Sequence, residues 1–402
     1  MEVFLTIYLL SGIIKAYLIF YNINPSYDIT LLSGILALLV YFSQELYTNN
    51  GIIHVSNKRN YVIFSFMLFW LWMFISLIYT QSPEYSMEKT ILFGTNIIPV
   101  FLISVKRDFN ISLFLKSFFV VTLSLTVLYV PILFFYQTIG VENYESVNAL
   151  YLILGISLGV CAVFLTTKEK DLFGKKVDRI SSILSFFLLI MLGARGPLLF
   201  AVFCVLFPCL FKRKIHIKTK LEKKTITNIL FFSLPFLLLI VILLCRYESF
   251  FEVFFERSFG RLSQLIDGFF GNSDMGESAN ARITHFESSL NILRNPSNFL
   301  FGLGIGSYGI VTSGSDGRLY PHNFILEIWT ELGLIGVLLF FLFLSKTLYI
   351  SKKQSHTYVT SALVIYTLLN LLKSSSLVDI RLFIAIWCMY WCNTNCMAKE
   401  KM

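Results

Sequence analysis

Long apolar runs constrain this chain more than any other sequence feature. They are about 20 residues long, which is enough to cross the hydrocarbon core of a bilayer as a helix. Of the 402 residues, 56% are hydrophobic and only 14% are charged, a balance well outside that of soluble domains. The pattern predicts an all-α polytopic membrane protein.

About twelve segments are expected to cross the membrane. We predict them at residues 3–21, 29–47, 61–80, 90–105, 112–135, 148–167, 180–194, 197–211, 226–245, 322–345, 358–372 and 380–397. The short pair around Gly196 could instead form one re-entrant hairpin. The chain then divides into residues 1–246 with nine helices, a large helical loop at 247–321, and residues 322–402 with three helices.

The positions of Lys and Arg predict the orientation, because cytoplasmic loops carry an excess of both. With a cytoplasmic N-terminus, most of the 33 Lys and Arg residues fall in cytoplasmic loops. The opposite loops near 22–28 and 136–147 hold none, and the one near 81–89 holds only Lys89. Both termini are therefore expected in the cytoplasm, with the 247–321 loop outside. The net charge of +9 follows from this topology and indicates no nucleic-acid partner.

The 247–321 loop uses arginine and no lysine as its cation. Its arginines are Arg257, Arg261, Arg282, Arg294 and Arg318. Because lysine predominates elsewhere, the loop selects the guanidinium group, which holds phosphate or carboxylate through two parallel hydrogen bonds. Each arginine could instead pair with an acidic residue of the loop. For the five together we favour anion binding.

Two glycine-containing motifs accompany arginines on the predicted outer side. Arg195 lies at the outward tip 193–197, where a charge is costly near membrane depth; the alternative is an interfacial arginine that reaches the headgroups. Arg282 opens a predicted helix at 280–294, which the glycine-rich stretch 302–309 follows. Gly304 and Gly306 in that stretch allow close backbone approach to a bulky ligand, or let the loop fold back.

A third motif marks the point where the chain re-enters the membrane. Asn323, Glu327 and Glu331 are spaced by four and share one helix face. Carboxylates inside an apolar run are costly, and they are functional candidates for that reason. His322 lies at the start of this helix, where an imidazole can act as a base or hydrogen-bond donor. The alternative for His322 is a polar anchor at the interface.

These motifs together resemble the O-antigen polymerase and O-antigen ligase superfamily (the Wzy and WaaL group) of bacterial envelope glycosyltransferases. The resemblance rests on the Ala-Arg-Gly tip at 194–196, the Arg282 helix with its glycine-rich sequel, the stretch from His322 to Gly336, and residues 79–83. One departure is Ala194, where a Ser or Thr often precedes the arginine.

The resemblance implies a reaction and a site. Superfamily members use a polyprenyl-diphosphate-linked oligosaccharide as donor, at the outer face of the bacterial cytoplasmic membrane. Arg195 and Arg282 would hold the diphosphate, His322 would orient or deprotonate the attacking sugar hydroxyl, and Glu327 would position His322 or a helix partner. Further expected substrate contacts are Arg257, Arg261, Arg318, Asn323, Gly304 and Gly306.

No cofactor and no metal are expected. The outer loop has no Asp-x-Asp motif, and no His or Cys cluster is available to hold a metal. Cys388, Cys392 and Cys396 share a helix face without a histidine and are read as small packing residues. The expected partners are the lipid-linked oligosaccharide, membrane lipids and a chain-length regulator protein.

Three functions remain open on the sequence. We favour a polymerase that joins lipid-linked repeat units, because the glycine-rich segment ahead of His322 and Asn323 is similar to the polymerases. The alternative is a ligase that transfers the glycan to the lipid A core. A flippase for lipid-linked glycans is the third, although the intramembrane charges gather at the outer face and no internal repeat is evident.

Overall fold

The computed structural model is all-helical over the residues that it describes. These are residues 1–23, 26–48, 57–104, 109–139, 150–168, 171–211, 260, 277–351 and 358–392. No strand occurs within these ranges. The predicted all-α membrane fold is therefore confirmed.

Within the described ranges, eleven helices form a bundle. They are α1 (Glu2–Phe20), α2 (Ile29–Thr48), α3 (Asn57–Ser76), α4 (Tyr85–Ser104), α5 (Ile111–Ile139), α7 (Leu150–Thr167), α8 (Lys175–Met191), α9 (Arg195–Phe211), α16 (Phe324–Ser351), α17 (Tyr358–Ser374) and α18 (Arg381–Cys392). Each overlaps one of the twelve predicted membrane segments, and the twelfth, at 226–245, lies outside the described residues.

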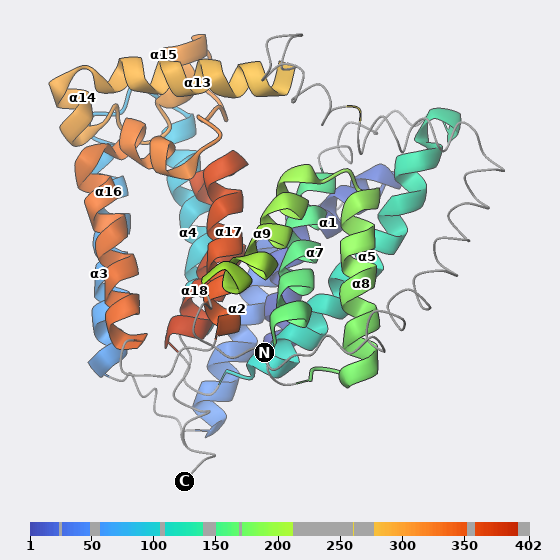
Figure 1. The fold of residues 1–402 in the computed structure, drawn as a ribbon. Coiled ribbons are helices and arrows are strands. Elements are labelled where there is room, and N and C mark those ends of the chain that lie inside the picture. Colours follow the sequence, from blue (N-terminus) through green and yellow to red (C-terminus); the bar gives the residue numbers. More distant parts are fainter. Residues whose placement is uncertain are drawn as a thin grey trace.

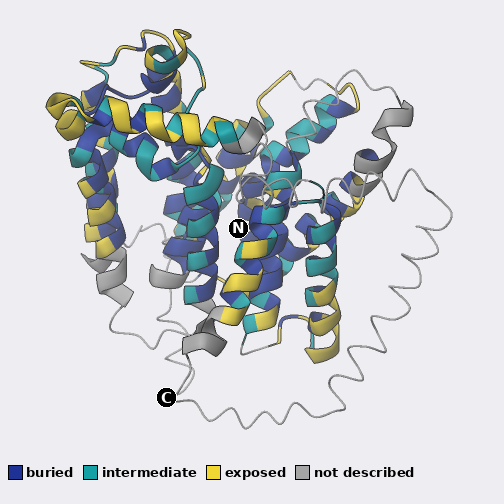
Figure 2. Ribbon diagram, turned by 45° about the horizontal axis from the view of Figure 1, so that its top comes forward, coloured by how far each residue is buried: buried dark blue, intermediate teal, exposed yellow. Residues whose placement is uncertain are grey.

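Six of these helices are long and apolar enough to span a bilayer: α1, α2, α4, α5, α7 and α16. Three shorter apolar helices, within α3, α9 and α17, accompany them. Figure 2 shows buried residues inside the bundle and exposed ones on its flanks, where large apolar side chains face outward. This distribution suits a lipid surrounding, and the protein is a multi-pass membrane protein.

Three further helices cover one end of the bundle. They are α13 (Glu277–Leu293), α14 (Pro296–Phe301) and α15 (Tyr308–Ser313), and we call them the cap. Figure 1 shows α13 lying across the bundle, roughly at right angles to α16 and α17. Helix α13 corresponds to the helix predicted at 280–294. The end of the bundle beneath it is called the cap end.

Small residues on α7 bring its neighbours close. A Cβ atom at Gly155 would overlap with Ala194, and one at Gly159 would overlap with the ring of Tyr366 on α17. Such a small-xxx-small pair is a common route to close helix packing in membranes. The Tyr366 hydroxyl donates a hydrogen bond of 3.1 Å to the carbonyl of Ile156. The contacts at Gly155 and Gly159 hold α9 and α17 against α7. Both α9 and α17 carry candidate site residues.

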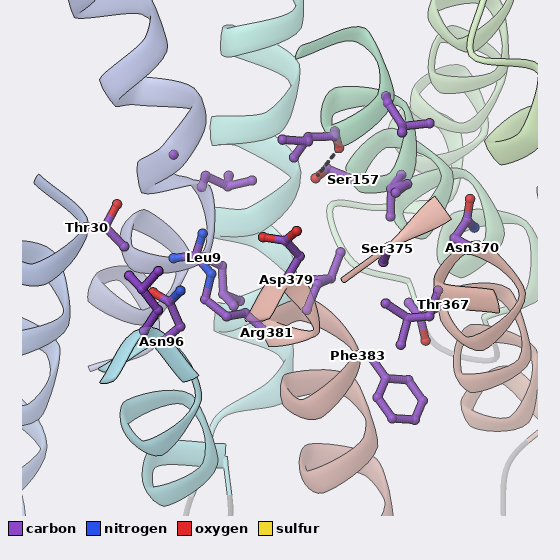
Figure 3. Close-up of a pocket in the computed structure, with 18 of the residues that line it drawn as sticks. Leu9, Thr30, Asn96, Ser157, Thr367, Asn370, Ser375, Asp379, Arg381 and Phe383 are labelled. Carbon is purple, nitrogen blue, oxygen red and sulfur yellow. Dashed lines mark hydrogen bonds between the residues drawn. The ribbon is translucent and has the colours of Figure 1, made fainter. Parts of the chain in front are cut away.

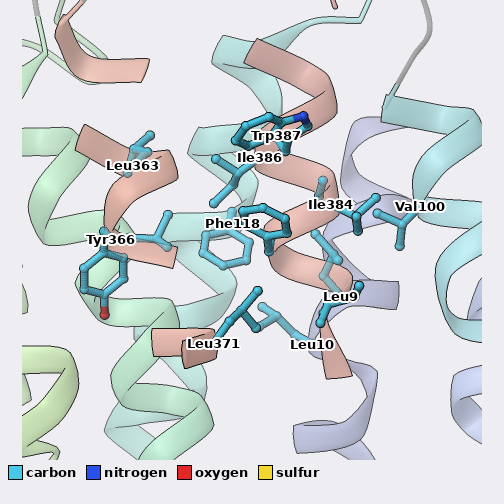
Figure 4. Packing of buried hydrophobic residues seen from close by; sticks show 14 of the residues in the cluster. Leu9, Leu10, Val100, Phe118, Leu363, Tyr366, Leu371, Ile384, Ile386 and Trp387 are labelled. Carbon is cyan, nitrogen blue, oxygen red and sulfur yellow. The ribbon is translucent and has the colours of Figure 1, made fainter. Parts of the chain in front are cut away.

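Apolar side chains from α1, α4, α5, α17 and α18 fill the middle of the bundle. Figure 4 shows Phe118 of α5 among Leu10 of α1, Leu371 of α17 and Ile384 of α18. All of these side chains are buried. The core therefore joins the N-terminal helices to the C-terminal ones across most of the sequence.

Helix α16 is bent at Gly333. Its backbone there has a φ of 67° and a ψ of −173°, which is not helical. The first part of α16 consequently runs beneath the cap, and the rest descends beside α3 (Figure 1). The carbonyl of Leu332, which the bend releases, accepts a hydrogen bond of 2.9 Å from the indole of Trp72.

Candidate active site

The glycine-rich stretch 302–309 is buried against the turn between α3 and α4. Gly304 and Gly306 have positive φ angles of 90° and 78°. A Cβ atom on Gly304 would collide with the backbone of Thr80, and one on Gly306 would press on that of Ser86. The Thr80 hydroxyl also donates a hydrogen bond of 2.7 Å to a carbonyl of this stretch. The glycines thus fold the loop back onto the bundle, and their contact with substrate stays a prediction.

The start of α16 places His322 and Asn323 beneath the cap. The Asn323 side-chain oxygen accepts hydrogen bonds from the backbone N–H groups of Ile325 and Leu326, at 3.0 and 3.2 Å. Asn323 is therefore the N-cap of α16. His322 has a φ of 57°, an uncommon backbone state for a residue with a side chain. Such states concentrate at functional sites, where the surrounding structure holds them.

His322 belongs to a pair of histidines. Its ring meets that of His285 on α13 edge to face, with centroids 5.4 Å apart, and the Tyr320 ring lies 4.7 Å away on another side. His285 Nδ1 lies 3.1 Å from the hydroxyl of Tyr308. Burial lowers the pKa of both histidines, and the charges of His285 and Arg282 lower the pKa of His322 further. A neutral imidazole at His322 can accept a proton.

Lys373 lies near two arginines, one of which, Arg282, also lies near His322. The side chain of Lys373, in the last turn of α17, packs against Gly196 beside Arg195. Lys373 lies within electrostatic range of both Arg195 and Arg282. Among the described residues, no carboxylate forms an ion pair with Lys373. Like charges gathered at the end of an apolar bundle are unfavourable unless an anion offsets them. We call Arg195, Arg282 and Lys373 the cation cluster.

A second charged group, Lys89 with Glu327 and Glu331, is fully buried. The Lys89 ammonium lies 2.5 Å from a carboxylate oxygen of Glu327 and 2.7 Å from one of Glu331. Glu327 also accepts hydrogen bonds from the Ser376 hydroxyl at 2.9 Å and the Leu377 backbone N–H at 2.7 Å. Glu327 was predicted to position either His322 or a helix partner. In the structure it contacts Lys89 of α4 and two residues that follow α17. None of its hydrogen bonds within the described chain reaches His322.

The other arginines predicted to bind substrate are distributed differently. Arg318 donates to Asp379 at 2.6 Å, an acid outside the 247–321 loop, and the Asp379 charge raises the pKa of Arg318. Arg257 and Arg261 lie outside the described residues. Within the described part of the chain, no group of three or more His, Cys, Asp or Glu side chains is placed to hold a metal ion.

A family model matches the part of the chain that holds most of the candidate residues. Residues 180–341 match the O-antigen ligase family (Wzy_C), and the match includes Arg195, Arg282, His322 and Glu327. This region is therefore similar to the O-antigen ligase and polymerase superfamily. A search of curated proteins found no match. The similarity over this region supports an O-antigen-related membrane enzyme.

Two of the charged residues described above lie outside the matched residues 180–341. Lys89 comes from α4 and Lys373 from α17, both outside the match. Sequence reasoning placed Lys89 in an outer loop because α4 begins five residues before the predicted segment. Lys373 was not predicted as a site residue, because it directly follows the predicted end of its helix at residue 372. His285 was also missed, although its position three residues after Arg282 puts both on one helix face.

Proposed function

We propose that the protein is a surface-polysaccharide polymerase that joins polyprenyl-diphosphate-linked oligosaccharide repeats at the outer face of the bacterial cytoplasmic membrane. The observation that carries this proposal is the cation cluster beside the neutral imidazole of His322. Two arginines and a lysine suit a diphosphate, since guanidinium groups bind phosphate oxygens in pairs. The distribution of Lys and Arg along the chain supports placing the cap outside.

The proposed reaction is a glycosyl transfer. The acceptor hydroxyl oxygen attacks the anomeric carbon of the donor sugar, and a new carbon–oxygen bond forms. The bond between that carbon and the diphosphate oxygen breaks, and the departing diphosphate keeps the electron pair. The cation cluster offsets the negative charge that grows on this leaving group. His322 accepts the proton of the attacking hydroxyl.

A ligase is the second candidate, because the family that matches residues 180–341 is described as O-antigen ligase. A ligase would use the same donor chemistry at the cation cluster. It would transfer a finished glycan to the lipid A core instead of joining repeats. The two functions therefore differ only in the acceptor.

The deciding experiment uses purified protein in detergent with lipid-diphosphate-linked repeats and no other acceptor. A ladder of multiples on a gel is the expected result and identifies a polymerase. Transfer that begins only when lipid A core is added would identify the ligase. If the cognate repeat gives neither product, the transferase proposal fails and transport of the lipid-linked glycan becomes the leading function.

Lysine substitutions test the cation cluster. Arg195→Lys and Arg282→Lys keep the charge but remove the guanidinium fork, so each should slow turnover on the order of 100-fold, as when a transition-state donor is lost. The matched control is Arg179→Lys, the same change on the exposed first turn of α8. If both variants are expressed and turn over at wild-type levels, the proposal that the cation cluster binds the diphosphate is refuted.

A further inference from the structure

A cavity of about 700 Å³ lies within the bundle, separate from the cation cluster. It is lined by residues of α1, α2, α4, α5, α7, α17 and α18 (Figure 3). Near the cap end its wall includes Arg318, Tyr320 and Asp379, and it extends to Leu9 and Asn96 in the middle of α1 and α4. Its lining is mainly apolar, with several amide and hydroxyl side chains among the aliphatic ones.

Arg381, the first residue of α18, is the charged group within this cavity that has the weakest internal partners. Figure 3 shows its side chain reaching from α18 toward α1. Its hydrogen bonds in the described chain go to the Tyr8 carbonyl at 3.4 Å and the Ser11 hydroxyl at 3.5 Å. Both distances are long for hydrogen bonds. The guanidinium also lies over the Tyr8 ring, 5.5 Å from its centroid. Both hydrogen bonds use Nη1, so within the described part of the chain its other N–H donors are left for another partner.

The two acids of the cavity wall are already paired with other cations. Asp379 binds Arg318 at 2.6 Å, and Asp28 binds Lys15 at 2.8 Å. No carboxylate in the described ranges forms an ion pair with Arg381. A positive charge in an apolar cavity without a counter-charge is unfavourable. An anion that enters the cavity would remove this cost.

We infer that the cavity is a second substrate subsite, in which Arg381 binds the phosphate of a lipid-linked acceptor. This inference rests on the proposed function, since a polymerase must hold two phosphate-bearing lipids at once. The apolar lining suits the lipid chain next to the phosphate. Tyr320 lines the cavity and contacts the His322 ring. A glycan that extends from the cavity past Tyr320 therefore reaches the base proposed to deprotonate it.

The stoichiometry of lipid diphosphate binding tests this subsite. Native mass spectrometry of the purified full-length protein with farnesyl diphosphate should show two bound molecules in the wild type. Arg381→Gln should weaken one of the two sites by roughly tenfold or more, whereas Arg282→Gln should weaken the other. Melting temperatures measured in the same detergent identify any variant that does not fold.

A cavity-filling variant gives a test that keeps the charge. Gly12 lines the cavity, and a Cβ atom built there would lie 3.7 Å from Nη2 of Arg381. Gly12→Leu should fill the space beside the guanidinium and abolish binding at the second site. Gly12→Ala is the matched control and should still bind two molecules, because its single methyl group makes only an ordinary contact.

Three outcomes would overturn the inference. These are one bound farnesyl diphosphate in the wild type, unchanged stoichiometry in both Arg381→Gln and Gly12→Leu, and equal competition at the second site by phosphatidylglycerol or inorganic pyrophosphate. Such competition would mean a site for ordinary anionic lipids or free anions. The ladder assay tests the proposed function separately. A ladder with a single binding site would reject only the subsite, and two sites without a ladder would reject only the polymerase.

Discussion

At the scale of single residues, the charges around His322 set its protonation state. The ring lies next to another imidazole and within range of the Arg282 charge, and it is partly buried. Each of these influences disfavours the imidazolium form and lowers the pKa of His322. The residue is consequently neutral over a wider pH range than an ordinary histidine, as a base for hydroxyl activation requires.

The transfer rate should therefore have an acid limb at unusually low pH. Protonation of His322 would remove the proposed base, so the rate should fall as the pH drops through its pKa, which lies below the ordinary value of 6.5. Initial rates measured from roughly pH 5 to 8 cover this range. His285→Gln removes a neighbour that lowers the pKa of His322, so the limb should move to higher pH. An unchanged limb in this variant would refute the electrostatic coupling of the two histidines.

Some site residues could be predicted from the sequence and others could not. Arg195 and Glu327 are conspicuous because a charge inside an apolar run is costly wherever it lies. Lys373 gives no such signal, since a lysine at the end of an apolar helix normally reaches the aqueous interface. The pairing of Arg318 with Asp379 joins residues 61 positions apart. Only the fold shows that this arginine has an internal partner.

At the scale of elements, the bend in α16 attaches the cap to the bundle. The backbone N–H groups of Leu303 and Gly304 donate to the carbonyls of Thr330 and Glu331, both at 2.9 Å. The bend at Gly333 follows directly after these carbonyls and turns the chain downward. The glycine pattern at 302–306 suggested that the loop folds back, but its partner on α16 is visible only in three dimensions.

Gly333→Ala should loosen this junction. A Cβ atom there would overlap with the backbone of Leu300 and Phe301, and the positive φ adds strain, of about 1–3 kcal/mol for a non-glycine residue. The melting temperature should fall clearly. The matched control is Gly314→Ala, since Gly314 has a φ of 75° but nothing within 4 Å of the added atom. Equal losses in the two variants would show that close packing at the bend contributes nothing.

At the scale of the whole molecule, Lys89, Glu327 and Glu331 join the first third of the chain to the last. Two carboxylates share one ammonium in a fully buried position, and the backbone N–H of Gly306 donates to Glu331 at 3.0 Å. Buried charges are tolerated only when they are paired and hydrogen-bonded. This group therefore requires α4, α16 and the glycine-rich stretch to assemble together.

Two substitutions test the charge balance of this group. Lys89→Gln leaves two buried carboxylates without a cation and should cost about 3–5 kcal/mol of folding free energy. Glu331→Gln leaves a balanced pair between Lys89 and Glu327, and it should lower the melting temperature much less. Melting curves and gel filtration in detergent measure both. If Glu331→Gln is equally damaging, charge balance does not explain the stability of the group, since glutamine keeps an oxygen that can accept from Gly306.

The same buried group has a consequence for how the protein is made. Glu331 follows Lys89 by 242 residues, so at ordinary translation speeds the ribosome needs tens of seconds to deliver it. A lone ammonium is not stable in hydrocarbon for that time. We expect α4 to wait at the membrane surface, or against the insertion machinery, until α16 emerges. A nascent chain that stops before α16 would then expose Lys89 without its carboxylate partners, and membrane quality-control proteases could recognise this lysine.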